Sequence, residues 1–158
     1  MSTSHARLNS PLGEILIVVE DGKVTGLYQV NQTNYPSETV IGAEDPSLRF
    51  HPVATELHRY FVGIKGNIES LIAPRGTDFQ KKVWEAIRNI KYGTTVTYKE
   101  LAEAIGSPKS TRAVANAVAK NPITVIIPCH RVVSQNGEVK YSGGERNKKK
   151  LLALEMGV

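Results

Sequence analysis

Cysteine is nearly absent from the sequence, since Cys129 is the only one among 158 residues. A single thiol cannot form an internal disulfide, so the composition favours a reducing cytoplasm over export. The four histidines, His5, His51, His58 and His130, have no metal-ligand spacing, and one cysteine supplies no thiolate cluster. We therefore expect no metal site.

Long apolar runs are absent as well. No stretch approaches the roughly 18 residues that span a membrane, and residues 1–7 form no apolar signal core. Because 41% of the residues are hydrophobic, the chain can still bury a core, in one domain or two small lobes. We expect a cytoplasmic protein with no membrane partner.

Charge is unevenly distributed along the chain, whose net charge is +5. Residues 1–72 contain 5 Lys+Arg and 8 Asp+Glu, a balance of −3, whereas residues 73–158 contain 15 and 7, a balance of +8. A basic C-terminal half is typical of a surface that binds polyanions such as nucleic acid. A solvated basic face would give the same composition.

Residues 1–72 are predicted to form an N-terminal lobe with a supporting role, a small antiparallel sheet with one helix. Apolar patterning and the Asp21-Gly22 turn predict a β-hairpin in its first part. The predicted elements are a strand over 11–20, its partner over 23–30, a loop over 31–50, a helix over 52–62 and a strand over 68–72. Residues 73–78 are a predicted linker.

Residues 79–158 are predicted to form a mostly helical C-terminal lobe, which makes the fold class α+β. Apolar residues at helical spacing predict three helices, over 79–90, 97–106 and 110–120. Thr97 and Ser110 are expected to cap the last two, whose short connecting turn is typical of a helix-turn-helix. Lys148-Lys-Lys150 opens a C-terminal helix, and we interpret this lysine run as a solvated face.

The helix predicted over 110–120 has a smooth outer face of small residues such as Ser110, Ala113 and Ala117. Small side chains permit close approach to a sugar-phosphate wall or entry into the narrow minor groove. The high helix propensity of alanine explains the same composition. Arg112, the long cation on this helix, fits either an ion pair with a carboxylate or insertion into DNA where a base has left the stack.

Cys129 lies between an apolar run, Ile123 to Ile127, and the pair Val132-Val133. The run predicts a buried strand that ends at Pro128. A strand end can hold a reactive side chain at the rim of a core, and a cysteine followed by a histidine, His130, is the simplest nucleophile-and-base pair. An inert buried thiol is the alternative, because free cysteine is among the most buried residue types.

Residues 74–155 closely resemble the O6-alkylguanine-DNA alkyltransferases. The shared motifs are Gly76-Thr-Asp-Phe-Gln80, Val83-Trp84, Gly93 to Tyr98, Leu101-Ala102, Gly106, Arg112-Ala-Val, Asn121-Pro122, Ile127-Pro-Cys-His-Arg-Val132, Tyr141-Ser-Gly-Gly144 and a closing Leu-Leu-x-x-Glu. The Pro-Cys-His-Arg core behind an upstream helix-turn-helix is highly specific. The N-terminal lobe is similar only in its size and its Pro-Leu-Gly strand start.

The resemblance implies direct reversal of DNA damage. An alkyl group on O6 of guanine, and also on O4 of thymine, would move irreversibly to Cys129, with no cofactor. The implied partner is double-stranded DNA bound through its minor groove, with the damaged base flipped into a pocket. A monomer without an obligate protein partner is expected.

The resemblance also implies roles for individual residues. Cys129 would be the alkyl acceptor, and His130 would act on it through a bridging water, because adjacent side chains tend to point apart. Glu155 would fix the imidazole tautomer, and Tyr98 would supply a proton or hydrogen bond to the departing guanine. Arg131 is expected to be buried with a partner.

A second group of residues is implied for DNA binding and for the substrate pocket. Arg112 would fill the stack that the flipped base has left, and Asn121 would tie the recognition helix to the cysteine segment. The other implied DNA contacts are Tyr98, Lys99, Gln80, Ser107, Ser110, Ala113 and Gln135. The other implied pocket groups are Tyr141, Ser142 and the backbone carbonyls of Cys129 and Val132.

Two positions depart from the family pattern. Lys140 stands where a small residue usually precedes Tyr141, which bears on the adducts that the pocket admits, and Ala115-Asn116 replaces a glycine-rich pair. Three other functions compete: a binding-only relative, a transcriptional regulator and a cysteine hydrolase. Cys129 opposes the first, because such relatives replace the cysteine. The chain lacks the metal-binding module of the second and any evident water-attack site for the third.

Overall fold

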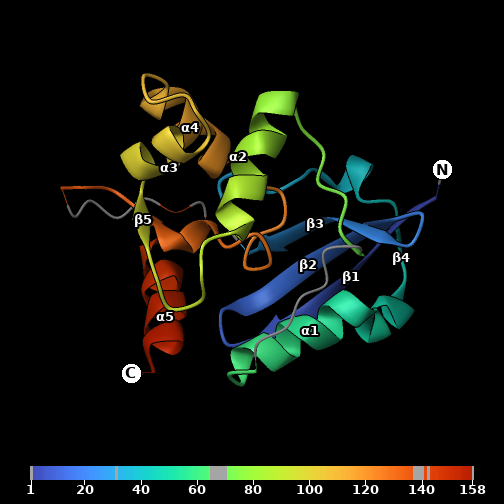
Figure 1. The fold of residues 1–158 in the computed structure, drawn as a ribbon. Helices are drawn as coiled ribbons and strands as arrows, with labels where there is room; N and C mark the ends of the chain where they lie inside the picture. The colour runs from blue at the N-terminus through green and yellow to red at the C-terminus, as the bar shows by residue number, and fades with distance from the viewer. Residues whose placement is uncertain (1, 31, 65–70, 137–140, 142, 158) are drawn as a thin grey trace.

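The structure is a computed structural model that describes residues 2–30, 32–64, 71–136, 141 and 143–157. It is an α+β fold, as the sequence predicts (Figure 1). In chain order its strands and α-helices are β1 (Thr3–Ser10), β2 (Gly13–Glu20), β3 (Lys23–Gln29), β4 (Ala43–Glu44), α1 (Pro52–Phe61), α2 (Asp78–Arg88), β5 (Val96–Thr97), α3 (Tyr98–Ala104), α4 (Thr111–Ala119), β6 (Val132–Val133) and α5 (Glu145–Met156). The 3-10 helices are η1 (Glu38–Val40), η2 (Pro46–Phe50) and η4 (Cys129–Arg131).

The N-terminal half contains a four-stranded sheet in the order β3-β2-β1-β4. The pairs β1–β2 and β2–β3 are antiparallel, as predicted for the sheet, whereas β4 joins β1 in parallel. The hairpin of β2 and β3 is confirmed, but β1 was not predicted. Only His5 and Ala6 are buried in β1, so its sequence carries little of the apolar alternation that marks a strand.

Strand β2 is buried on both faces. Its odd-numbered residues from Ile15 to Val19 belong to the main core, whereas the even-numbered ones pack with Ile41 in a smaller cluster. Because both faces are covered, β2 has a continuous apolar run in place of alternation. The prediction of a plain loop over 31–50 is wrong, since this segment contains β4, η1 and η2 and supplies Ile41.

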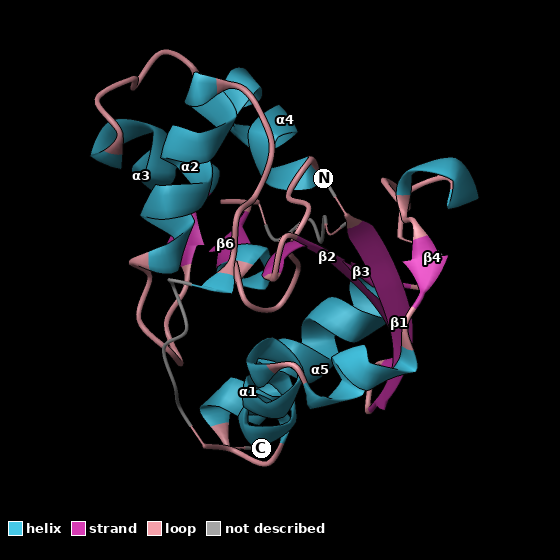
Figure 2. Ribbon diagram, turned by 90° about the vertical axis from the view of Figure 1, so that its right-hand side faces the viewer, coloured by secondary structure: helices cyan, strands magenta, loops and turns pink. Residues whose placement is uncertain are grey.

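Helices α2, α3 and α4 pack together at the end of the molecule that lies away from α1 (Figures 1 and 2). The indole Nε1 of Trp84 in α2 donates to the carbonyl of Ala117 in α4 at 2.8 Å. Thr97 caps α3 through a capping box with Glu100, as predicted. Ser110 occupies the N-cap position of α4, as predicted, but its side chain makes no capping hydrogen bond.

The segment before Cys129 is a tight turn and not the predicted strand. Ile123 and Ile127 take part only in isolated bridges, and the amide of Ile127 donates to the carbonyl of Ile123 at 2.9 Å. At its centre Val125 has a φ of 72°, an outlying conformation for a β-branched residue. A continuous apolar run has no periodicity, so its sequence does not distinguish a strand from another kind of buried segment. Here the run folds back and carries Cys129 into the interior.

Apart from the smaller cluster around Ile41, buried apolar side chains of both predicted lobes join in one main cluster, which includes Ile17 in β2 and Leu151 in α5. The strand predicted over 68–72 lies mostly outside the described residues, and Ile72 makes a single bridge with Val24. Helix α5 begins at Glu145, one turn before the lysine run that was expected to open it. None of the helices in the described part of the chain has the length and apolarity to cross a membrane.

Candidate active site

Cys129 opens η4, directly after the turn, and its side chain is only 2% exposed. It lines a cavity of about 300 Å³ together with Tyr98 and Tyr141, two residues that the sequence assigned to the site. Burial raises the pKa of the thiol to about 11, against the opposing effects of the Asn121 side chain and the positive charge of Lys148. The thiol is therefore protonated at neutral pH.

Thr33 and Asn116 also line this cavity, and neither was assigned to the site. Thr33 lies in the segment predicted as a loop, and Asn116 lies on the exposed side of α4. Asn116 is one of the two positions that depart from the family pattern. The cavity therefore combines residues of the N-terminal half, α3, α4 and η4.

His130 is fully buried beside Cys129, and its Nε2 atom lies 2.6 Å from Oε2 of Glu155. The contact expected between these two residues is thus present. Because a carboxylate only accepts, the proton of the neutral imidazole resides on Nε2 and Nδ1 is the unprotonated nitrogen. Among the described residues Nδ1 has no hydrogen-bond partner. Burial lowers the pKa of His130, although Glu155 opposes this shift.

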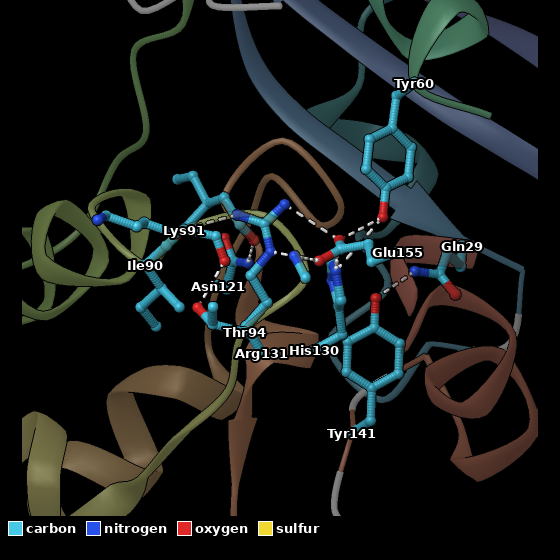
Figure 3. Close-up of polar contacts among 12 residues, drawn as sticks. Gln29, Tyr60, Ile90, Lys91, Thr94, Asn121, His130, Arg131, Tyr141 and Glu155 are labelled. Atoms are coloured by element: carbon cyan, nitrogen blue, oxygen red, sulfur yellow. Dashed lines mark hydrogen bonds and ion pairs between the residues drawn. The ribbon is translucent and has the colours of Figure 1, made fainter. Parts of the chain in front are cut away.

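Glu155 is the acceptor at the centre of a buried polar cluster (Figure 3). Its Oε1 accepts from Arg131 Nε at 2.8 Å and from the Gly93 amide at 3.0 Å. Its Oε2 accepts from His130, from Arg131 Nη2 at 3.0 Å and from the Tyr60 hydroxyl at 2.6 Å. Burial alone would raise the pKa of Glu155, but the bonds from His130 and Arg131 outweigh it and hold the pKa well below the usual range.

Arg131 has the buried partner that was expected for it, since it forms two bonds to Glu155 and a third to the Ile90 carbonyl at 2.8 Å. Its guanidinium also lies 5.5 Å from the centre of the Tyr92 ring. A buried carboxylate is stable only when it is paired and hydrogen-bonded. Arg131 therefore keeps Glu155 ionised beside His130.

Lys148 is buried, which contradicts its interpretation as part of a solvated face. Its Nζ donates to the carbonyl of Val132 at 2.7 Å, and burial lowers its pKa. The Val132 carbonyl, expected to accept from the guanine amino group, thus already has one donor. Lys149 and Lys150 are exposed as expected.

Asn121 joins the end of α4 to the turn before Cys129. Its Nδ2 donates to the Ile127 carbonyl at 2.8 Å, and its Oδ1 accepts from the Ile123 amide at 3.0 Å. From the N-terminal half, Asn34 donates to the Asn121 carbonyl at 3.1 Å. The link that was expected between α4 and the cysteine segment is present in the hydrogen bonds.

Tyr141 is held from the N-terminal half by Gln29 (Figure 3). Nε2 of the fully buried Gln29 donates to the Tyr141 hydroxyl at 2.7 Å, and Oε1 accepts from Asn147 at 2.8 Å. The ring of Tyr141 stands edge-on to His130, with centroids 6.5 Å apart. Ser142 and Lys140, which were also named for this region, lie outside the described residues.

Most of the residues implied to contact DNA lie at the surface around α2, α3 and α4. Arg112, Ala113, Lys99 and Gln135 are exposed, and Ser107 and Ser110 are partly exposed. Gln80 has a structural task, because its Oε1 accepts from the Thr77 amide in the capping box of α2. In the described part of the chain, no group of three or more acidic, histidine or cysteine side chains is placed to hold a metal ion.

Besides Thr33 and Asn116, the sequence analysis missed three further site neighbours, Tyr60, Lys148 and Gln29. Tyr60 and Gln29 belong to the half that was given a supporting role. Tyr60 lies 95 positions before its partner Glu155, and no local pattern reveals a contact over that separation. Gln29 carried no signal, because β3 reads Lys-Val-Thr-Gly-Leu-Tyr-Gln and a glutamine at the end of such a mixed strand is usually exposed.

Comparison with known proteins agrees with this geometry. The family model of the 6-O-methylguanine DNA methyltransferase DNA binding domain matches residues 78–157. A methylated-DNA–protein-cysteine methyltransferase of Mycolicibacterium paratuberculosis is 39% identical over 152 residues, which is 96% of this chain and 91% of the relative. A protein of the same name from Methanosarcina acetivorans is 40% identical over 96% of this chain and 97% of its own.

Solved structures give the same result. Mycobacterium tuberculosis OGT in complex with DNA superposes with a TM-score of 0.89 at 37% identity, covering 98% of this chain and 93% of the other. An O6-methylguanine DNA methyltransferase of Methanococcus jannaschii has a TM-score of 0.68 at 26% identity, covering 95% and 92%. This chain therefore belongs to the methylated-DNA–protein-cysteine methyltransferase family.

Proposed function

We propose that this protein repairs DNA by moving an alkyl group from O6 of guanine to Sγ of Cys129, once per molecule. The observation that carries this proposal is the position of Cys129 at the wall of a cavity, next to the buried His130–Glu155 pair. A nucleophile, a base and a group that orients the base are the parts that activation of a thiol needs. O4 of alkylated thymine is a second proposed substrate.

Transfer begins with removal of the thiol proton. We assign a bridging water to this step, because Nδ1 of His130 is an acceptor with no partner among the described residues and no direct bond joins it to Cys129 there. The thiolate then attacks the alkyl carbon and the carbon–O6 bond breaks. Its electron pair moves into the guanine, which takes up a proton from Tyr98, and the proton that left the thiol returns to Tyr98 through solvent. The products are S-alkylcysteine and guanine.

The pKa shifts of Cys129 and His130 suggest that the reaction requires a damaged base in the pocket. The thiol has a pKa of about 11 and burial lowers the pKa of His130, so proton transfer between them is unfavourable in the free protein. Binding of the damaged base must therefore supply part of the driving force. The developing charge on guanine, stabilised by Tyr98, is the proposed source.

DNA is the proposed partner, and α3 with α4 is the proposed helix-turn-helix that enters the minor groove. Arg112 is exposed on α4 and would occupy the gap that the flipped base leaves. The proposed contacts to the DNA backbone are Lys99, Ser107, Ser110, Ala113 and Gln135.

We propose that a monomer acts, without a protein partner, on chromosomal DNA in the cytoplasm. The division into a lobe over 1–72, a linker over 73–78 and a lobe over 79–158 remains part of the proposal.

Intact-mass measurement after incubation with duplex DNA containing O6-methylguanine tests the proposed reaction. The protein should gain one CH2, because a methyl group replaces the thiol proton, and peptide mapping should locate it on Cys129. The Cys129→Ser variant should gain nothing while it still binds the duplex. Tight binding by the wild-type protein without any gain in mass would instead support a binding-only function.

A further inference from the structure

Tyr60 connects the N-terminal half of the chain to the proposed base. It lies near the end of α1, and its hydroxyl donates to Oε2 of Glu155 at 2.6 Å. The same hydroxyl oxygen lies 3.4 Å from Nε2 of His130. The Tyr60 and His130 rings meet edge to face with centroids 6.5 Å apart. Figure 3 shows the phenol directed at the place where Glu155 and His130 meet.

Tyr60 and His130 share one carboxylate oxygen. Oε1 of Glu155 is occupied by Arg131 and by the Gly93 amide, whereas Oε2 accepts from Tyr60, His130 and Arg131. Each donor to a carboxylate oxygen lowers the affinity of that oxygen for a further proton. The bond from Tyr60 therefore weakens the attraction of Oε2 for the imidazole N–H.

Tyr60 keeps its proton throughout the range of physiological pH. Burial raises the pKa of its phenol, and Glu155 raises it further. The hydroxyl is consequently a permanent donor to Oε2. Its ring contacts the rings of Phe61 and Tyr92 edge to face, with centroid distances of 5.4 and 6.1 Å.

We propose that Tyr60 is a positioning residue for alkyl transfer, which fixes Oε2 of Glu155 and limits its pull on His130 so that the imidazole stays neutral. This inference rests on the proposed function. A neutral His130 retains Nδ1 as a proton acceptor, whereas a protonated one cannot accept the proton of the thiol. Tyr60 thus adjusts the base through Glu155, without touching the substrate.

Other titratable and charged groups lie around His130, on every element packed against it. They are Cys129 and Arg131 in η4, Lys148 and Glu155 in α5, Tyr141 before α5, and Tyr60 in α1, with Tyr92 after α2 packed against Tyr60 and Arg131. Arg131 and Lys148 both disfavour the imidazolium, and Glu155 favours it. Loss of the Tyr60 hydroxyl leaves the other groups in place and strengthens the effect of Glu155.

The test compares Tyr60→Phe with the wild-type protein in single-turnover alkyl transfer from O6-methylguanine duplex DNA over a range of pH. In the variant His130 is easier to protonate, so the acidic limb of the pH–rate profile should move to higher pH, by about one unit. Nuclear magnetic resonance of the labelled imidazole should show the same displacement of the His130 titration. Fluorinated tyrosine at position 60 is a stronger hydrogen-bond donor, so it should move the acidic limb and the His130 titration to lower pH.

Phe61→Leu is the packing control, because it disturbs the ring beside Tyr60 and removes no hydrogen bond to Glu155. It should lower the melting temperature and leave the acidic limb in place. An unmoved limb and an unmoved His130 titration in Tyr60→Phe would overturn the inference, as would an equal displacement in Phe61→Leu. Failure of wild-type Cys129 to gain a methyl group would refute the proposed function instead, and the imidazole titration would still decide the role of Tyr60.

Discussion

The reactivity of Cys129 depends on where its sulfur lies more than on its chemical type. An ordinary cysteine has a pKa of about 8.5, and burial in this site raises it to about 11. Only the thiolate is nucleophilic. The free protein should consequently behave as if its single thiol were blocked.

We expect iodoacetamide to modify the folded protein slowly at neutral pH and progressively faster as the pH approaches about 11. Unfolding in urea should restore the reactivity of an ordinary thiol, with a midpoint near pH 8.5. Mass spectrometry of samples quenched at intervals gives both rates. If the rate for the folded protein also had its midpoint near pH 8.5, burial would not control the acidity of the thiol.

Reactive residues that stand together in a local motif were predictable from the sequence, whereas residues that contact them from distant parts of the chain were not. The Cys129-His130 pair stands in one short stretch, and the expected contact with Glu155 is present. Tyr60 reaches the same carboxylate from a different half of the chain. Lys148 was misread because a lysine run is usually solvated, yet here the first lysine of the run faces the Val132 carbonyl.

The turn before Cys129 is the element that the sequence describes least well. Its residues 123–127 are all apolar or β-branched, which favours a strand. Long-range contacts override that preference: Thr124 donates through its backbone amide and its hydroxyl to the Leu27 carbonyl. The helices were better predicted, because their 3.6-residue period and their caps are local signals.

Val125 offers a test of this turn, since its φ of 72° is unfavourable for valine and alanine and readily adopted by glycine. Val125→Ala loses buried methyl groups and keeps the strain, whereas Val125→Gly loses them and relieves strain of about 1–2 kcal/mol. Glycine normally costs about 0.5–1 kcal/mol more than alanine. Here we expect the order to reverse, so that the glycine variant has the larger free energy of unfolding in urea. A glycine variant less stable than the alanine variant would contradict the strained turn.

At the scale of the whole molecule, the two halves of the chain are joined by polar contacts as well as by a common core. Gln29 in β3 binds both Tyr141 and Asn147, and Asn34 binds the carbonyl of Asn121. Tyr60 adds a third connection at Glu155. The half that was predicted to be supporting therefore contacts the cysteine segment, the pocket tyrosine and the base.

Gln29→Met should destabilise the protein by about 1–3 kcal/mol, because it leaves the buried Tyr141 hydroxyl without its donor. Tyr141→Phe removes that hydroxyl, so the double variant should cost less than the sum of the two single changes. Urea unfolding of all four proteins measures the coupling. Gln135→Met, at an exposed glutamine, serves as the control and should change stability by less than about 0.5 kcal/mol. Additive costs would show that the bond between Gln29 and Tyr141 is not formed in solution.

Arg112→Ala should slow repair of duplex DNA more than reaction with free O6-benzylguanine, which needs no base flipping. Arg49→Ala removes an exposed cation from the opposite half of the chain and should leave both rates unchanged. Affinity for duplex should also fall as salt is raised, because phosphate contacts release counterions. Equal losses on the two substrates in Arg112→Ala would refute the role of this residue in the DNA stack.

The acidity of Cys129 has a further consequence, for how long one molecule remains usable. With a pKa of about 11, only on the order of 10⁻⁴ of the sulfur is thiolate at pH 7. Peroxides and other cellular oxidants attack the thiolate, and the more highly oxidised forms of cysteine that result cannot be reduced back. A protein that acts once must remain intact between its synthesis and its encounter with a lesion. Because its sulfur is buried and protonated, the unreacted protein should resist oxidation for longer than a protein with an ordinary exposed thiol.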